Sequence, residues 1–272
     1  MPPRGAAGDP GPAGAHHHTC GDPEPSVPIA LHGERRNVTL RLHDVIPQGA
    51  GPRALDLVEI AAVTLMTDIG VRRGENEAWV RDLSIRAPVR DPAFWEQRAG
   101  ALERIVHFLT GDNVSLTFAP REPVESAAAQ CPAPEVDGGC LLPGGVDSSG
   151  GAAALLKANR RPALVSHSAG NPSVDEAQRH VAASLGRTFD CTPTRLEVFL
   201  APSRVQNPAA PFPAEEEREP SQRSRAFVFL AAAVAAADAV GVEEVYAFEN
   251  GVLACHLPPT RARVGSLSTR SN

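Results

Sequence analysis

Apolar and polar residues show no regular pattern at the start of the chain, and a pattern begins only near Val27. Residues 1–26 consist mainly of Pro, Gly, Ala and Asp. Such a segment cannot bury enough apolar surface to offset the entropy lost on ordering. We therefore expect residues 1–26 to be a disordered leader, whose histidine run from His16 to His18 fits a flexible tail better than a metal site.

The region 27–121 has the pattern of a small α+β domain. Two short strand-like runs flank a polar turn and predict a hairpin, and later segments alternate between strand and helix periods. The expected elements are strands at 27–31 and 38–42, a helix at 55–69, a strand at 79–89, a helix at 91–109 and a strand at 114–118. No catalytic constellation is recognisable in this accessory domain.

A second periodic region, 139–272, follows a Pro- and Ala-rich linker at 122–138. The expected elements are strands at 140–142, 163–166, 195–200 and 244–248, and helices at 152–157, 173–185 and 225–240. Strands that alternate with helices predict an α/β fold with a parallel sheet. The Pro- and Glu-rich segment 201–222 has no packing pattern and could form a mobile lid.

Composition narrows the classes of function. The chain has 272 residues, of which 42% are hydrophobic, and a formal net charge of −6. No run of about 18 apolar residues occurs, so we expect no membrane span, and the negative charge makes direct nucleic-acid binding unexpected, although a local basic pocket is possible. The first residues contain no apolar signal segment, so we expect a cytoplasmic protein.

The five cysteines do not form a recognisable pattern. They are widely spaced and include no C-x-x-C pair, at Cys20, Cys131, Cys140, Cys191 and Cys255. This spacing supports neither a disulfide framework nor a zinc knuckle, so we expect the thiols to be buried small hydrophobes.

A glycine turn carries the strongest chemical signal. The run from Pro143 to Ser149 lies between an expected strand and an expected helix, where backbone N–H groups and the helix dipole form an anion site. Gly144 and Gly145 have no Cβ and permit close approach of a phosphate. A carboxylate at Asp147 would repel it unless a divalent cation lies between, which implies Mg²⁺. The alternative, equally open, is that Asp147 and its neighbour are only helix N-caps.

The turn has neither Walker nor Rossmann spacing, but it resembles another signature. Leu-Pro-Gly-Gly-Val-Asp-Ser-Ser at 142–149 is similar to the S-G-G-x-D-S motif of the PP-loop ATP pyrophosphatases. Within that superfamily the chain resembles QueC, the 7-cyano-7-deazaguanine synthases, and the QueC-like, QatC-type proteins of antiphage defence. Residues 223–230 are similar to the P-G-R-N-x-x-F-L helix start of QueC, and 249–251 with 268–270 resemble a segment of the defence-type relatives.

The resemblance covers about residues 139–272 and implies a PP-loop nucleotide-binding domain. It implies ATP-dependent adenylation of a carboxylate on a 7-deazaguanine-type substrate, with release of AMP and pyrophosphate. An amide or nitrile would follow, or conjugation to a protein amine in antiphage defence by a partner docked on the accessory domain. The residues implied are Gly144, Gly145, Asp147, Ser148, Ser149, Ser166 and His167 for ATP, Asp147 and Arg225 for catalysis, Asp147 for Mg²⁺ through phosphate, and Glu249, Asn250 and Arg270 for the substrate.

For several of these residues, a purely structural interpretation remains open as an alternative to the implied functional role. His167 could be a solvated loop residue just after its strand, Arg225 an exposed first-turn arginine, and Glu249-Asn250 an ordinary turn. Other superfamily activities, tRNA thiolation and amidotransfer, are less favoured because the chain lacks a cysteine pair and an N-terminal nucleophile.

Three departures from the family pattern favour an alternative function. Pro143 replaces the first serine of the motif and removes a hydroxyl and an N–H. Ala226 replaces an asparagine, and the zinc-binding cysteine quartet of QueC is missing, so zinc is not supported and a C-terminally shortened domain is expected. The alternative is a degenerate scaffold that binds ATP without turnover.

Overall fold

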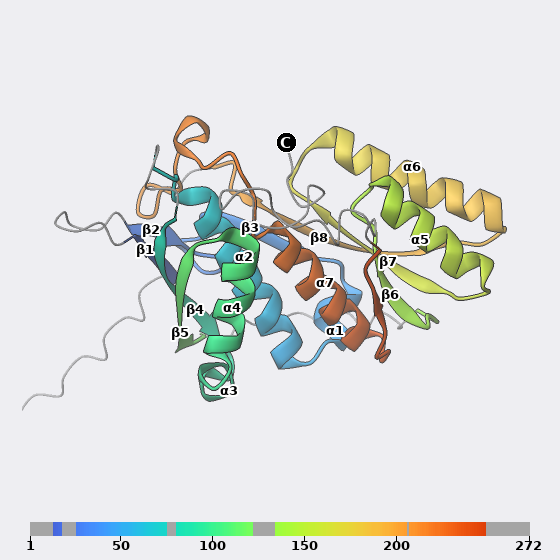
Figure 1. Cartoon of the computed structure of the whole chain (residues 1–272), viewed down its shortest axis with the longest axis horizontal. Helices are drawn as coiled ribbons and strands as arrows, with labels where there is room; N and C mark the ends of the chain where they lie inside the picture. Colours follow the sequence, from blue (N-terminus) through green and yellow to red (C-terminus); the bar gives the residue numbers. More distant parts are fainter. Residues whose placement is uncertain (1–12, 18–25, 75–79, 122–133, 206, 249–272) are drawn as a thin grey trace, which may run out of the picture.

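The fold is described by a computed structural model that places residues 13–17, 26–74, 80–121, 134–205 and 207–248 (Figure 1). These residues form two β-sheets separated by helices. The first sheet has the strand order β2-β1-β4-β5, with β1 at Ala13–His17, β2 at Ser26–Ile29, β4 at Asp82–Val89 and β5 at Asn113–Pro120. The prediction of a wholly disordered leader is therefore wrong for Ala13–His17, because this short segment pairs antiparallel with both β2 and β4.

Two short helices join β4 to β5. The expected single helix is divided into α3 (Pro92–Glu96) and α4 (Ala99–Thr110), and β4 and β5 then pair in parallel. Asp91 accepts a hydrogen bond from the backbone N–H of Phe94, which caps α3 and follows the usual pattern of an acidic N-cap with proline behind it. Trp95 at the end of α3 is buried.

The helix α2 (Pro52–Gly70) packs in the middle of the molecule and joins the two sheets. All of its residues from Val58 to Gly70 are buried, although the pattern predicted one apolar face. A helix enclosed on every side must contact several elements, and α2 packs on β4 of the first sheet and on α7 (Arg225–Ala239). Figure 1 shows α2 and α7 beside each other between the sheets.

The second sheet is mostly parallel, as the alternation of strands and helices predicts. Its order is β3-β8-β7-β6-β9, with β3 at Val38–Leu42, β6 at Gly138–Leu141, β7 at Pro162–Ser168, β8 at Thr194–Pro202 and β9 at Val245–Tyr246. Only β3 is antiparallel to its neighbour within this sheet. The helices α5 (Val146–Lys157) and α6 (Pro172–Phe189) cover one face and α7 covers the other (Figure 1).

The strand order reverses at β6, and this reversal positions the site. The chain proceeds from β6 through β7 to β8 in one direction, and then returns through α7 to place β9 on the opposite side of β6. In open α/β sheets a crevice forms at the carboxyl ends of strands where the order reverses, and ligands bind there.

Two expectations about the chain between and after these elements are wrong. The predicted hairpin is not formed, because β2 joins the first sheet while β3 joins the second. The segment 201–222 is not an unpacked lid, because Phe212 is buried in the core and the Ala210 carbonyl accepts a hydrogen bond from Asn37 at 2.9 Å.

The two expected domains share one apolar core. It includes Leu65 of α2, Ile85 of β4 and Val198 of β8, so the region 27–121 does not pack as a separate unit. A short helix, α1 (Val45–Gly49), and a 3-10 turn at Glu215–Glu217 complete the described elements. In the placed part of the chain, no helix combines the length and apolar character needed to cross a membrane.

Candidate functional site

A cavity of about 670 Å³ lies at the carboxyl ends of β6 and β9. Its walls are the loop after β6, the first turns of α5, α6 and α7, and the two residues Ala247 and Phe248 that follow β9. This is the position where the strand order reverses. Three helices of 12, 18 and 15 residues therefore begin at one hollow.

Two of these helices begin without a side-chain cap. Gly145 is the N-cap of α5 and has no side chain, whereas Ser224, the N-cap of α7, directs its hydroxyl to another element. Only α6 has a side-chain cap, because Asn171 Oδ1 accepts from the Ser173 N–H at 3.1 Å. The positive ends of α5 and α7 are consequently open toward the cavity, which favours an anion there.

The loop after β6 is held in place by Gln178 of α6. The fully buried Gln178 Nε2 donates to the Pro143 carbonyl at 3.3 Å and to the His167 carbonyl at 3.1 Å. Gly144 has φ +97°, in the left-handed region that favours glycine, and a Cβ at this position would lie 3.2 Å from Gln178 Cγ. Glycine at position 144 thus has both a conformational and a steric cause.

Arg225 lines the cavity and has no counter-ion among the described residues. Its Nε has no hydrogen-bond partner, and none of the described acidic side chains forms an ion pair with it. Its guanidinium carbon lies 5.3 Å from the centroid of the Phe229 ring, and burial lowers the pKa of the guanidinium below its usual value. Arg225 is half-buried, not the exposed first-turn arginine of the plain interpretation. A guanidinium that forms no ion pair with a described residue, beside two open helix N-termini, favours an anion.

Asp147, Ser148 and Ser149 lie inside α5, because the helix begins at Val146 and not near Ala152. The interpretation of Asp147 and Ser148 as caps is therefore wrong. The hydroxyls of Ser148 and Ser149 donate to the Gly145 carbonyl at 3.0 and 2.7 Å. Asp147 and Ser148 line the cavity, whereas Ser149 does not.

Ser166 and His167 both lie within β7, so the expectation that His167 follows the strand is wrong. Both are buried and neither lines the cavity. The His167 ring packs edge-to-face on Phe229, with 5.4 Å between ring centroids, and Phe229 separates it from the cavity. His167 is therefore not a solvated loop residue either.

The environment of His167 keeps its ring neutral. Burial, and then the charge of Arg225, lower the pKa of His167 to about 3, while the backbone of Leu200 opposes this shift weakly. Neither ring nitrogen forms a hydrogen bond with a group in the described ranges, and the Ser166 hydroxyl has no partner there.

Aromatic walls of the cavity were not expected from the sequence. Phe229 and Phe248 line it together with the aliphatic Val174 and Leu230. Phe248 packs so closely on α5 that a Cβ at Gly151 would lie 2.0 Å from Phe248 Cγ. The only sequence signal was a glycine inside a helix, which often marks close packing.

Few of the other residues predicted for the site lie in this region. Among the described residues, Asp147 alone supplies a carboxylate to the cavity wall, and these residues contain no cluster of three or more His, Cys, Asp or Glu side chains. One carboxylate suits Mg²⁺ when phosphates supply other ligands. Glu249, Asn250 and Arg270 lie outside the described residues.

The cysteines that the structure places do not approach the cavity. Cys140 on β6 is buried, and burial raises the pKa of its thiol to about 11. Cys191 is exposed, contrary to expectation. Cys20, Cys131 and Cys255 lie outside the described residues.

Comparisons with known proteins did not identify a relative of this chain. No family model matches the chain, and neither the curated proteins nor the solved structures contain a significant match.

Proposed function

We propose that the chain binds ATP in the cavity at the β6–β9 reversal and uses it to adenylate a carboxylate, in the manner of the PP-loop enzymes that its glycine turn resembles. The observation that carries this proposal is Arg225, which forms no ion pair within the described part of the chain, beside the uncapped N-termini of α5 and α7. Three convergent positive groups suit a triphosphate, whose charge is spread over several oxygens.

The apolar part of the cavity suits the adenine ring. Phe229, Leu230 and Val174 form a wall next to the polar loop, and nucleotide sites commonly combine such a wall with a few convergent polar groups. The neutral His167 behind Phe229 adds no second positive charge near the base. A deazaguanine substrate is also planar and apolar on its faces, and would pack against Phe248.

The reaction needs positioning more than a protein nucleophile. A substrate carboxylate oxygen would form a bond to the α-phosphorus, while the bond from that phosphorus to the bridging oxygen breaks and pyrophosphate leaves with the electron pair. Arg225 would stabilise the negative charge that develops on the leaving group. Asp147 would hold Mg²⁺ through the phosphates, which supplies further charge neutralisation. Ammonia or a protein amine would then displace AMP from the mixed anhydride.

The direct test combines ATP affinity with pyrophosphate release. We expect the full chain with ATP, Mg²⁺ and 7-carboxy-7-deazaguanine to release pyrophosphate. Arg225→Gln should weaken ATP binding at least about ten-fold, equivalent to roughly 1.4 kcal/mol. Arg187→Gln, which removes an exposed arginine at the far end of α6, is the control and should bind ATP normally. If the unmodified chain is not stabilised by ATP, the nucleotide assignment is wrong.

A non-catalytic ATP-binding scaffold is the second candidate, and Pro143 favours it. Proline at this position donates no N–H to a phosphate, and the nearby hydroxyls of Ser148 and Ser149 are already engaged with the Gly145 carbonyl. This function predicts ATP binding with no AMP formed. Measurement of AMP beside ATP affinity therefore distinguishes the two candidates.

A further inference from the structure

A second hollow lies on the face of the parallel sheet that α5 and α6 cover in part, away from the cavity described above. Leu164 of β7 packs in the apolar cluster under α5 and α6, and the register Leu164↔Arg195 and Ser168↔Phe199 places Phe199 of β8 on the same face. Beyond β7 this face is only partly covered, since Phe199 and Ala201 are half-buried. A groove of about 800 Å³ lies over β8 and β3 at this point.

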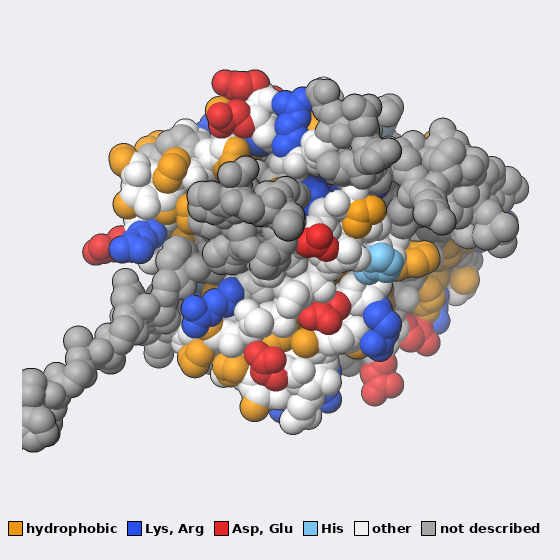
Figure 2. All heavy atoms as spheres, turned by 60° about the vertical axis from the view of Figure 1, so that its left-hand side comes forward, with side chains coloured by type: hydrophobic (Ala, Val, Ile, Leu, Met, Phe, Trp, Pro, Cys, Tyr) orange, Lys and Arg blue, Asp and Glu red, His pale blue; other side chains and the backbone are white. Residues whose placement is uncertain are grey.

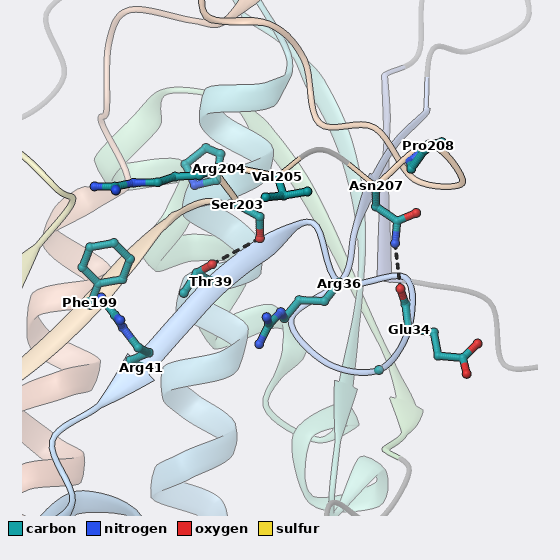
Figure 3. Close-up of a pocket in the computed structure, with 12 residues that line it drawn as sticks. Glu34, Arg36, Thr39, Arg41, Phe199, Ser203, Arg204, Val205, Asn207 and Pro208 are labelled. Carbon is teal, nitrogen blue, oxygen red and sulfur yellow. Dashed lines mark hydrogen bonds between the residues drawn. The ribbon is translucent and has the colours of Figure 1, made fainter.

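Three arginines from three separate segments line this groove (Figure 3). Arg36 comes from the turn before β3, Arg41 from β3 itself and Arg204 from the residues after β8. Figure 3 shows Arg41 and Arg204 on opposite sides of the Phe199 ring. The guanidinium carbon of Arg41 lies 4.4 Å from the ring centroid, an arrangement that orients a guanidinium and leaves its N–H edge free.

The groove has little compensating negative charge. None of the three arginines forms an ion pair with an acidic side chain in the described ranges. Glu34 is the only acidic residue among those that line the groove, and Figure 3 shows its carboxylate directed away from the arginines. Figure 2 shows one face of the molecule, on which basic and acidic side chains are interspersed. The chain as a whole is acidic, at −6, so this gathering of positive charge is local.

Two hydroxyls add neutral hydrogen-bonding groups to the same surface. Thr39 Oγ1 and Ser203 Oγ lie 3.2 Å apart across the β3–β8 pair, and either atom can donate. One hydroxyl proton of the pair stays available for a ligand oxygen. Arginines next to hydroxyls are the side chains that most often hold phosphate groups.

We propose that this groove binds a multiply phosphorylated ligand, with Arg36, Arg41 and Arg204 as its phosphate-binding residues. Phosphate suits the groove better than a single carboxylate because three cations from separate segments need more than one negative charge as partner. The Phe199 ring is a positioning residue, since it holds Arg41. The phosphates could belong to a small polyphosphate or to a single-stranded nucleic acid, and the chemistry of recognition is the same.

The groove is distinct from the proposed ATP site. The loop between β7 and α6 separates them, because a Cβ at Gly170 would lie 3.7 Å from Phe199 while Ser173, three residues later, lines the other cavity. Binding to the groove therefore does not depend on Arg225, and measurements in an Arg225→Gln background remove the competing cation.

Two phosphate probes test the proposal, both in the Arg225→Gln background. Calorimetry measures binding of inorganic tripolyphosphate, and fluorescence anisotropy measures binding of a labelled single-stranded thymidine oligonucleotide. We expect at least one probe to bind, and Arg36→Gln/Arg41→Gln to weaken that probe by about ten-fold or more, as loss of two charge-assisted contacts requires. A Phe199→Leu variant should weaken it less, because the guanidinium remains but is less ordered. The probe that binds identifies the source of the phosphate.

The matched control is Arg35→Gln/Arg187→Gln, which removes the same net charge from two exposed arginines outside the groove. It should bind the probes as the parent does. Equal weakening in the control, absence of binding by both probes, or tighter binding of a labelled poly-glutamate peptide would each overturn the proposal. Thermal unfolding of the two double-arginine variants should match the parent, because Arg35, Arg36, Arg41 and Arg187 are all exposed.

Discussion

Asp68 on α2 accepts two hydrogen bonds from Ser224, the residue that precedes α7. Its Oδ2 receives both the backbone N–H and the hydroxyl of Ser224, each at 2.9 Å. Asp68 Oδ1 accepts a hydrogen bond from the Arg81 guanidinium at the same time. The start of α7, and with it Arg225, is thus fixed by a residue about 156 positions earlier in the chain. The part of the chain expected to be accessory therefore positions a wall of the candidate site.

Replacement of Ser224 by alanine should loosen this connection without removing a cavity-lining group. The variant loses one buried hydrogen bond to a charged acceptor, and we expect the free energy of unfolding to fall by about 1.5–3 kcal/mol. Chemical denaturation measures this loss. ATP affinity should fall by a smaller factor than in Arg225→Gln, because the guanidinium is still present.

Ser115→Ala provides the comparison for that experiment, since Ser115 is an exposed strand residue. Its free energy of unfolding should change by no more than about 0.5 kcal/mol. If Ser224→Ala is as stable as Ser115→Ala, the link between α2 and α7 contributes little.

The buried ion network below this link predicts acid sensitivity. Asp112 is fully buried and accepts hydrogen bonds from Arg73 and Arg81. Burial opposes its ionisation, but the hydrogen bonds and charges of Arg81 and Arg73 outweigh burial and hold the pKa of Asp112 below its usual 3.8. A lowered carboxyl pKa stabilises the fold above the usual pKa, and this stability is lost as pH falls through the lower folded value.

The corresponding variant is Asp112→Asn. It should destabilise the protein by about 3–5 kcal/mol near neutral pH, because two buried guanidinium groups lose their shared carboxylate. The loss of stability as pH falls below the usual carboxyl pKa of 3.8 should also be smaller in the variant than in the parent. Urea unfolding at a series of pH values measures both effects. If the free energy of unfolding of the variant falls with pH as steeply as that of the parent, Asp112 is not the source of the acid sensitivity.

Local patterns predicted the individual elements well, and their limits are visible at particular residues. The period over 55–69 located α2, and alternation located β4, β5 and β8. Alternation could not indicate that Val38–Leu42 joins β8, because a strand's partner depends on contacts 160 or so residues away. The same limit explains why the predicted hairpin is wrong.

Burial of charge was the least predictable feature. Arg81 belongs to the segment 79–89 that was expected to be a strand, yet it is fully buried and pairs with carboxylates from two other segments. Gly144 and Gly145, which the glycine turn marked in the sequence, line the candidate cavity, whereas the lining residues from separate converging elements were predicted less well. Phe229 and Gln178 carry no local signal, because their role depends on α6 and α7 meeting the loop.

The two loop glycines should respond differently to alanine. Gly144→Ala places a Cβ at φ +97° and 3.2 Å from Gln178 Cγ, so we expect a loss of about 1–2 kcal/mol in unfolding free energy. Gly145 has φ −81° and open space at the Cβ position. Gly145→Ala should therefore retain most of the stability but weaken ATP binding, because its methyl group projects where a phosphate would approach. Equal ATP affinity in Gly145→Ala and the parent would argue against phosphate at this loop.

The buried His167 predicts a second pH dependence, at milder acidity. Its pKa is lowered from 6.5 to about 3 in the folded state. The unfolded chain binds a proton on this ring below about pH 6.5 while the folded chain does not, so stability is complete above that pH and falls as pH drops toward 3. His167→Phe keeps the ring contact with Phe229 and removes the titration.

Urea unfolding between about pH 7 and pH 4.5 should show a shallower decline for His167→Phe than for the parent. His180→Phe is the control, because His180 is an exposed residue of α6 and should leave the slope unchanged. If the free energy of unfolding of the parent does not decline in this pH range, the conclusion that the buried His167 ring stays neutral is wrong.

Pro143→Ser is the substitution that separates the two candidate functions. Serine restores the hydroxyl and the N–H that the family motif has at this position, while the Pro143 carbonyl that accepts from Gln178 is a backbone group and is retained. If the site is a weakened adenylating enzyme, the variant should form AMP faster than the parent, by about ten-fold for one added charge-assisted hydrogen bond of roughly 1.4 kcal/mol. If the site only holds the nucleotide, ATP affinity should rise with no AMP formed. The Pro143→Ala variant restores the N–H alone and divides the gain between the two groups. A Pro143→Ser protein that neither binds ATP more tightly nor turns it over would place the phosphate elsewhere in the molecule.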